Sequence, residues 1–204
     1  MYKAIIFDFG GIIYQHPKEV IPEVLARIYN QPIEITIREY GKYKDDYFMG
    51  KLSTNALITS LSSSFTSDKS VNEVRKLWLK YYSELAKPNK EVLGIIKILH
   101  KSYKIYLFSN TTEMSNLHNS KTGLYDYFDG LFLSYQMRMS KPAKEIYEKV
   151  VSIIGFKPQE CLFIDDDVKN IEQAVQMGMK TILFNVLTDP PSKLKEELHK
   201  LQVY

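Results

Sequence analysis

The feature of this chain that most constrains its fold is a set of short apolar runs, each of which ends in a polar or turn residue. The runs are rich in β-branched and aromatic residues, and their apolar positions are continuous rather than alternating with polar ones. Continuous runs of this length are typical of strands buried on both faces, as in a parallel sheet covered by helices. The predicted strands are residues 4–7, 105–108, 131–133, 161–164 and 181–184.

Most of these runs are separated by segments with helical periodicity. Apolar residues recur at every third or fourth position in residues 92–99, 146–154 and 171–175. An alternation of strands and helices favours the α/β class, with a parallel sheet that carries helices on both faces.

The interval from residue 16 to residue 87 breaks this alternation, because it contains helical periodicity and no strand-like run. Its predicted helices are residues 20–29, 35–48, 55–61 and 71–85. An insertion after the first strand lies over the crevice at the carboxyl ends of the strands, where open α/β sheets bind ligands. We therefore predict an α/β core domain made of residues 1–15 and 88–204, and a small α-helical cap domain made of residues 16–87.

Composition and charge exclude several other classes of protein. No apolar run approaches the ~18 residues of a membrane span, and the first run ends at Asp8, too early for a signal peptide. The net charge of +3 is spread along the chain, whereas nucleic-acid binding needs a concentrated basic patch. The single cysteine, Cys161, cannot form an intramolecular disulfide, which fits a reducing compartment. We predict a cytoplasmic globular protein without nucleic-acid or membrane partners, and the oligomeric state stays open.

Polar residues follow several of the predicted strands directly, and a lysine precedes the helix before the fourth strand. Because the carboxyl ends of parallel strands meet at one edge of a sheet, we expect these side chains to converge in a small volume. Adjacent acids at a strand end repel one another and need a cation, and oxygen ligands favour a hard ion such as Mg²⁺. The residues concerned are Asp8, Gly10, Gly11, Ser109, Asn110, Lys141, Asp165 and Asp166.

This set resembles the four motifs of the haloacid dehalogenase (HAD) superfamily, in the same order along the chain. The motifs match residues 5–13 around Asp8, residues 107–110, Lys141-Pro142, and residues 163–166 with Asn170. The resemblance covers nearly the whole chain and includes a helical cap inserted after the first motif. Within the superfamily the chain looks most like the branch of the sugar-phosphate phosphatases and the epoxide-hydrolase N-terminal domain.

The resemblance implies a Rossmann-like core and a Mg²⁺-dependent phosphatase that hydrolyses a small phosphorylated metabolite through an aspartyl-phosphate. Asp8 would be the nucleophile. Ser109 and the backbone near Asn110 would donate hydrogen bonds to phosphoryl oxygens, and Gly11 would belong to the same phosphate-binding set. Lys141 would neutralise the transferring group and keep Asp8 ionised.

The same resemblance implies the ligands of the metal. The carboxylates of Asp8 and Asp166 and the backbone carbonyl of Gly10 would hold Mg²⁺, and Asp165 would either bind the ion itself or support one of its ligands. The ion would shield the anionic nucleophile from the anionic substrate.

One position departs from the pattern of HAD phosphatases, which generally carry a second aspartate two residues after the nucleophile. That residue protonates the leaving group and then activates water, a contribution worth about 10²–10⁴ in rate. Here the position is Gly10. Three explanations stay open: another residue supplies the proton, with His16 and Glu19 as candidates; the substrate has a good leaving group; or the protein is a weak or vestigial enzyme.

Two other functions stay open beside the phosphatase. A 2-haloacid dehalogenase, in which Asp8 attacks carbon, also lacks the second aspartate. It needs no metal, however, and the Asp165-Asp166 pair would then repel beside the nucleophile. The other alternative is a catalytically degenerate binding protein on the HAD frame, which gives no structural reason for keeping this set of polar residues together.

A few residues near the site receive a structural prediction. Asp167 is expected to cap the following helix, and Cys161 to be an unreactive core residue inside a strand. In the cap segment most tyrosine rings would pack between helices, and a few would line the substrate pocket. These tyrosines are Tyr29, Tyr40, Tyr43, Tyr47, Tyr81 and Tyr82.

Overall fold

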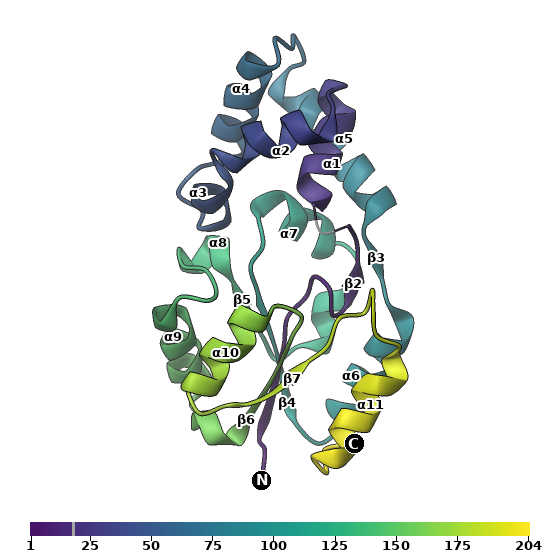
Figure 1. The fold of residues 1–204 in the computed structure, drawn as a ribbon, viewed down its shortest axis with the longest axis vertical. Coiled ribbons are helices and arrows are strands. Elements are labelled where there is room, and N and C mark those ends of the chain that lie inside the picture. Colours follow the sequence, from purple (N-terminus) through teal and green to yellow (C-terminus); the bar gives the residue numbers. More distant parts are fainter. Residues whose placement is uncertain (18) are drawn as a thin grey trace.

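The computed structural model in Figure 1 describes residues 1–17 and 19–204. Its main sheet has five parallel strands in the order β5-β4-β1-β6-β7, so that the first strand of the chain lies in the centre. Every predicted strand is present with each bound within one residue of the prediction, and the parallel α/β fold is confirmed. The strands are β1 (Ala4–Phe7), β4 (Lys104–Ser109), β5 (Gly130–Leu133), β6 (Cys161–Asp165) and β7 (Lys180–Leu183).

Helices cover both faces of this sheet: α6 (Lys90–Leu99) and α11 (Pro191–Lys200) on one, α9 (Lys144–Ile154) and α10 (Val168–Gln176) on the other. Successive side chains of a strand point to opposite faces. Ile5 and Phe7 accordingly share a buried cluster with α6 and α11, whereas Ala4 and Ile6 share one with α9 and α10. Burial on both sides explains the continuous apolar run of β1. Among the described residues, no helix is long and apolar enough to cross a bilayer.

Further helices lie together over the carboxyl edge of the sheet, in the segment predicted as a cap (Figure 1). They are α1 (Val20–Tyr29), α2 (Ile33–Gly41), α3 (Lys44–Phe48), α4 (Thr54–Ser64) and α5 (Val71–Leu85). The prediction of one helix over residues 35–48 is wrong, because the segment forms two, α2 and α3. The N–H groups of Lys42 and Tyr43 bond to carbonyls three residues back, and this tighter pattern ends the first helix.

The chain enters and leaves the cap helices through a two-stranded antiparallel ribbon of β2 (Tyr14–Gln15) and β3 (Lys87–Pro88). Both predicted domain boundaries lie at this ribbon, and the division into two domains stays a prediction. The remaining elements are α7 (Glu113–Asn119), α8 (Ser134–Met137), and two short 3-10 helices, η1 (Leu124–Tyr127) and η2 (Pro158–Glu160).

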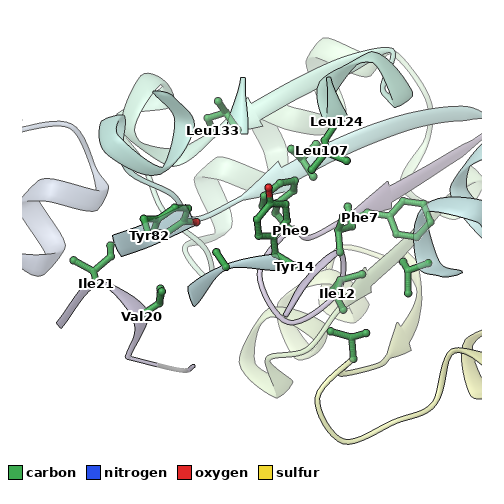
Figure 2. Packing of buried hydrophobic residues seen from close by; sticks show 14 of the residues in the cluster. Phe7, Phe9, Ile12, Tyr14, Val20, Ile21, Tyr82, Leu107, Leu124 and Leu133 are labelled. Carbon is green, nitrogen blue, oxygen red and sulfur yellow. The ribbon is translucent and has the colours of Figure 1, made fainter. Parts of the chain in front are cut away.

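One hydrophobic cluster joins the cap helices to the sheet. Figure 2 shows Phe9 and Tyr14 side by side, and their rings stack with 4.7 Å between centroids. Val20, Ile21 and Tyr82 of the cap helices belong to the same buried cluster. This shared packing places α1 and α5 over the carboxyl end of β1.

Polar contacts also connect the cap helices with the elements that follow β4 and β5. Arg75 Nη2 lies 3.1 Å from Glu113 Oε1, and Thr54 Oγ1 donates to the other oxygen of the same carboxylate at 2.6 Å. Ser134 Oγ donates to the Phe48 carbonyl at 2.7 Å. These polar contacts therefore attach the cap helices to the core in addition to the ribbon and the hydrophobic cluster.

Candidate active site

The strand ends bring Asp8, Lys141 and two further aspartates into one small volume, as the sequence predicts. Asp8 directly follows β1, and its N–H donates to the Ile164 carbonyl at 2.8 Å. Carboxylate oxygens of Asp8, Asp165 and Asp166 lie within 4.8 Å of one another. Lys141 Nζ lies 2.9 Å from Asp8 Oδ1 and 2.6 Å from Asp165 Oδ2. This is the convergence expected at the carboxyl edge of a parallel sheet.

Lys141 is held from several directions. Its Nζ donates to the Phe108 carbonyl at 2.9 Å, and the Asn110 side chain bonds both its backbone N–H and its carbonyl at 2.8 Å. Burial by itself would lower the pKa of Lys141, but the carboxylates of Asp165 and Asp8 raise it above the ordinary value. Lys141 is therefore a buried permanent cation, and the side-chain amide of Asn110 positions it.

Asp165 has no exposed surface, and both of its oxygens are already engaged. Oδ1 accepts from the Asp167 N–H at 2.8 Å and from Asn170 Nδ2 at 3.0 Å, while Oδ2 accepts from Lys141. Asp165 could bind the ion itself or support one of its ligands, and these bonds favour the supporting role. Asp167 Oδ1 accepts from the Lys169 N–H at 2.8 Å at the start of α10, so its predicted capping role is confirmed.

Gly11 makes room for Asp166, one of the predicted metal ligands. Its φ is +72°, and a Cβ added there would lie 2.3 Å from Asp166 Oδ2. The Gly11 N–H donates to the Tyr14 carbonyl at 3.0 Å, which leaves the predicted phosphate-binding role without a backbone donor. Asn185 Nδ2 donates to Asp166 Oδ2 at 3.2 Å. Asn185 was not among the predicted site residues, although it stands just after the last predicted strand.

The carboxylates of Asp8 and Asp166 carry more negative charge than their surroundings compensate. Burial raises the pKa of Asp8 to about 7, with Asp165 and Asp166 adding to the rise and Lys141 opposing it. Burial and the neighbouring Asp165 raise the pKa of Asp166 to about 6. Asp8 Oδ1 is buried and accepts no well-aligned hydrogen bond from the described residues. Two such carboxylates, close to the Gly10 backbone, fit a divalent cation with oxygen ligands.

A cavity of about 140 Å³ opens above Asp8, between the sheet edge and the cap helices. Ser109, Asn110 and Thr111 line it from the sheet, and Ser109 is 4% exposed. Of the cap tyrosines, Tyr40 and Tyr82 line it, which agrees with the expectation that a few rings would do so.

The imidazole of His16 fills the space beside Gly10. A Cβ added to Gly10 would lie 2.9 Å from His16 Nε2. His16 Nδ1 donates to the Pro17 carbonyl at 2.8 Å, which leaves Nε2 toward the glycine. Burial lowers the pKa of His16. His16 and Glu19, the two candidates for the missing acid, both line the cavity with Asp8.

Taken together, the central parallel sheet, the aspartate after its middle strand and the helices inserted behind it define a HAD-type hydrolase. A family model described as haloacid dehalogenase-like hydrolase matches residues 2–178, and the chain belongs to this family.

Individual relatives agree with this assignment. D-ribitol-5-phosphate phosphatase of Bacteroides thetaiotaomicron is 29% identical over 190 residues, which cover 89% of this chain and 91% of that protein. A HAD-like family hydrolase from Porphyromonas gingivalis superposes with a TM-score of 0.80 at 25% identity, over 97% of this chain and 98% of that one. A HAD family enzyme of Bacteroides thetaiotaomicron, solved as a magnesium complex, gives a TM-score of 0.79 at 25% identity, over 92% and 96%. The resemblance to the HAD superfamily is confirmed, and the phosphatase branch fits.

Proposed function

We propose that this protein is a Mg²⁺-dependent phosphatase that hydrolyses a small phosphorylated metabolite through an aspartyl-phosphate on Asp8. The observation that carries the proposal is the setting of Asp8 in the wall of a cavity between the sheet edge and the cap helices. A buried lysine lies 2.9 Å from one of its oxygens, and Asp166 lies close by. A phosphatase of similar length among the relatives supports the same conclusion.

In the first half of the reaction, an Asp8 oxygen attacks phosphorus. The new O–P bond forms as the ester O–P bond breaks, and the leaving oxygen takes up a proton. Lys141 opposes the effect of burial on Asp8 and so favours its ionised, nucleophilic form. The Ser109 hydroxyl, which lines the cavity beside Asp8, donates to a phosphoryl oxygen.

In the second half, water attacks the phosphorus of the aspartyl-phosphate, gives up a proton, and releases inorganic phosphate and the Asp8 carboxylate. Asp8, Asp166 and the Gly10 carbonyl would hold Mg²⁺, with Asp165 keeping Lys141 in place. The chemistry that Mg²⁺ supplies when bound here is compensation of the charge shared by the carboxylates and the phosphoryl group.

His16 is our choice for the group that replaces the missing aspartate. Its Nε2 occupies the space where a side chain on Gly10 would begin, and it lines the cavity with Asp8. The protonated imidazole would give its proton to the leaving oxygen, and the neutral imidazole would accept one from the attacking water. Over one cycle the proton balance on His16 therefore closes.

The two alternatives account less well for the same residues. A dehalogenase that works without metal leaves the raised pKa values of Asp8 and Asp166 without a compensating cation. A protein that only binds phosphate has no need of an ionised carboxylate beside the anion, because the two negative charges repel each other. We also propose that the substrate is small, that the protein is cytoplasmic, and that it has no nucleic-acid or membrane partner.

The test is hydrolysis of p-nitrophenyl phosphate with and without Mg²⁺, beside halide release from 2-chloropropionate. Asp8→Asn should abolish phosphate release while leaving the fold intact, because an amide is a poor nucleophile. Asp167→Asn is the matched control: it removes a neighbouring carboxylate, but asparagine also caps helices well, so activity should stay within about twofold. Phosphate release in EDTA, or by Asp8→Asn at a rate within tenfold of wild type, would contradict the proposal.

A further inference from the structure

Asp166 differs from the other two carboxylates of the site because it has no buried cation beside it. Lys141 Nζ lies 2.9 Å from Asp8 Oδ1 and 2.6 Å from Asp165 Oδ2. Among the residues that the structure describes, none forms an ion pair with Asp166, and one side chain donates a hydrogen bond to it. That donor is Asn185 Nδ2, which lies 3.2 Å from Asp166 Oδ2. The amide of Asn185 is therefore the group that can fix the direction of this carboxylate.

The orientation of the Asn185 amide is set by its own loop. Its Oδ1 accepts from the Leu187 N–H at 2.8 Å, which is an Asx turn. Its backbone N–H donates to Asp189 Oδ2 at 3.1 Å. Because Oδ1 already accepts from an N–H, the NH₂ group faces Asp166; the reverse orientation would place an oxygen against a carboxylate. The loop therefore aims a donor at Asp166.

The same loop is bonded to the two neighbouring strand ends. The Val186 N–H donates to the Gly11 carbonyl at 2.7 Å, and the Phe184 N–H donates to the Asp165 carbonyl at 3.1 Å. The side chains of Phe184 and Val186 are buried in the hydrophobic cluster. The loop after β7 thus connects the segment after β1 with the segment after β6, and these two segments carry the proposed metal ligands.

Asn185 lies outside the cavity in which the substrate is proposed to bind. It lines a separate surface groove together with Gly10, Gly11 and Asp166, whereas neither Asn185 nor Asp166 lines the cavity above Asp8. A change at Asn185 should therefore act through the carboxylate and not through contacts with the substrate. An amide also orients the carboxylate without neutralising its charge, so this charge stays available to a cation.

We propose that Asn185 is a positioning residue that holds one oxygen of Asp166 and leaves the other for Mg²⁺, so that the loop after β7 sets the affinity of the site for the ion. This inference rests on the proposed function and adds to it a residue outside the four motifs. Groups that orient a metal ligand by a hydrogen bond are typically worth 10–100-fold in metal affinity.

The experiment titrates wild type and Asn185→Ser with Mg²⁺ by calorimetry at pH 8 and measures p-nitrophenyl phosphate hydrolysis over a range of Mg²⁺ concentrations. Serine can still accept from the Leu187 N–H in a turn, but its side chain is one atom shorter and loses the contact with Asp166. Asn185→Ser should lower the Mg²⁺ affinity by about tenfold. Excess Mg²⁺ should restore kcat to within about threefold of wild type, with KM for the ester within about twofold.

Val186→Ala is the matched control, because Val186 is the next residue of the loop and its buried side chain packs in the hydrophobic cluster. This variant loses packing but keeps the backbone bond to Gly11 and the Asn185 amide. It should lower Tm more than Asn185→Ser does and leave the Mg²⁺ affinity within about twofold of wild type. The comparison separates the stability of the loop from the orientation of the carboxylate.

Three results would overturn the positioning role: an unchanged Mg²⁺ affinity in Asn185→Ser, a kcat that excess Mg²⁺ does not restore, or an equal loss of affinity in Val186→Ala. Because the titration needs no turnover, this proposal and the proposed function can fail separately. Mg²⁺ binding by wild type without hydrolysis of p-nitrophenyl phosphate would refute the proposed function, while the titrations would still decide the role of Asn185. A wild type that binds no Mg²⁺ would refute both.

Discussion

The affinity of this protein for Mg²⁺ should depend steeply on pH, and the structure gives the size of the effect. Protonated carboxylates do not bind the ion, so each proton on Asp8 or Asp166 must leave first. Their pKa values of about 7 and about 6 mean that acidification from pH 8 to pH 5 protonates both. Asp8 contributes about two powers of ten and Asp166 about one. The apparent affinity should fall by about 10³-fold, or ~4 kcal/mol.

Through Asp8, acidification should stabilise the metal-free protein, whereas acid ordinarily destabilises folded proteins. The folded pKa of Asp8 is raised from 3.8 to about 7, so the folded state binds more protons than the unfolded state between these values. The free energy of unfolding contributed by Asp8 therefore falls as pH rises from 4 to 7, by on the order of 4 kcal/mol. Mg²⁺ should raise Tm far more at pH 8 than at pH 5.

Calorimetric Mg²⁺ titrations at pH 5, 6, 7 and 8, in two buffers that differ in ionisation enthalpy, measure both the affinity and the protons released. Asp8→Asn should remove the larger part of the dependence and leave about tenfold from Asp166. An apparent Mg²⁺ affinity that is the same at pH 5 and pH 8, with no protons released, would refute the assignment of these two carboxylates as ligands.

Three further substitutions have defined outcomes. Gly11→Ala strains a residue with positive φ and drives Cβ into the Asp166 carboxylate. The free energy of unfolding in urea should therefore fall by ~1–3 kcal/mol, and activity should need more Mg²⁺. Gly94→Ala, where an added Cβ meets no other atom, is the control. Lys141→Met leaves two buried carboxylates without their cation and should cost ~3–5 kcal/mol by the same measurement; a loss below 1 kcal/mol would contradict the pairing. His16→Ala should slow hydrolysis of alkyl phosphates by about 10²–10⁴ and of aryl phosphates much less, because phenolate leaves without a proton; equal losses on both would remove His16 from proton transfer.

The sheet and the convergence of the site could be predicted from the sequence because both follow from local patterns. Runs that are apolar at every position predict strands buried on both faces, and parallel strands bring the residues after them to one edge. Asp8, Lys141, Asp165 and Asp166 were found by this reasoning. Asn185 follows the last predicted strand in the same way, so the same pattern points to it as well.

The detailed roles could not be predicted, because they depend on contacts between distant segments. The Asn110 side chain holds the backbone of Lys141, and the two residues are 31 positions apart. Gly11 leaves room for the Asp166 carboxylate because it has no Cβ, and no pattern in the sequence indicates this contact.

Gly10 and His16 show why a departure from a family pattern has to be considered with the residues around it. In the sequence, Gly10 is only the absence of an acid. In the folded chain, the space of the missing side chain is taken by an imidazole from the segment between β2 and α1, so an aspartate restored at position 10 would meet His16 Nε2 at 2.9 Å from its Cβ. Gly10→Asp should therefore not raise the rate of alkyl phosphate hydrolysis above that of wild type. The glycine and the histidine form one arrangement, in which the proposed proton donor comes from the connection to the cap helices instead of from the sheet. Its Nδ1 bond to the Pro17 carbonyl leaves Nε2 beside Gly10, in the wall of the cavity above Asp8.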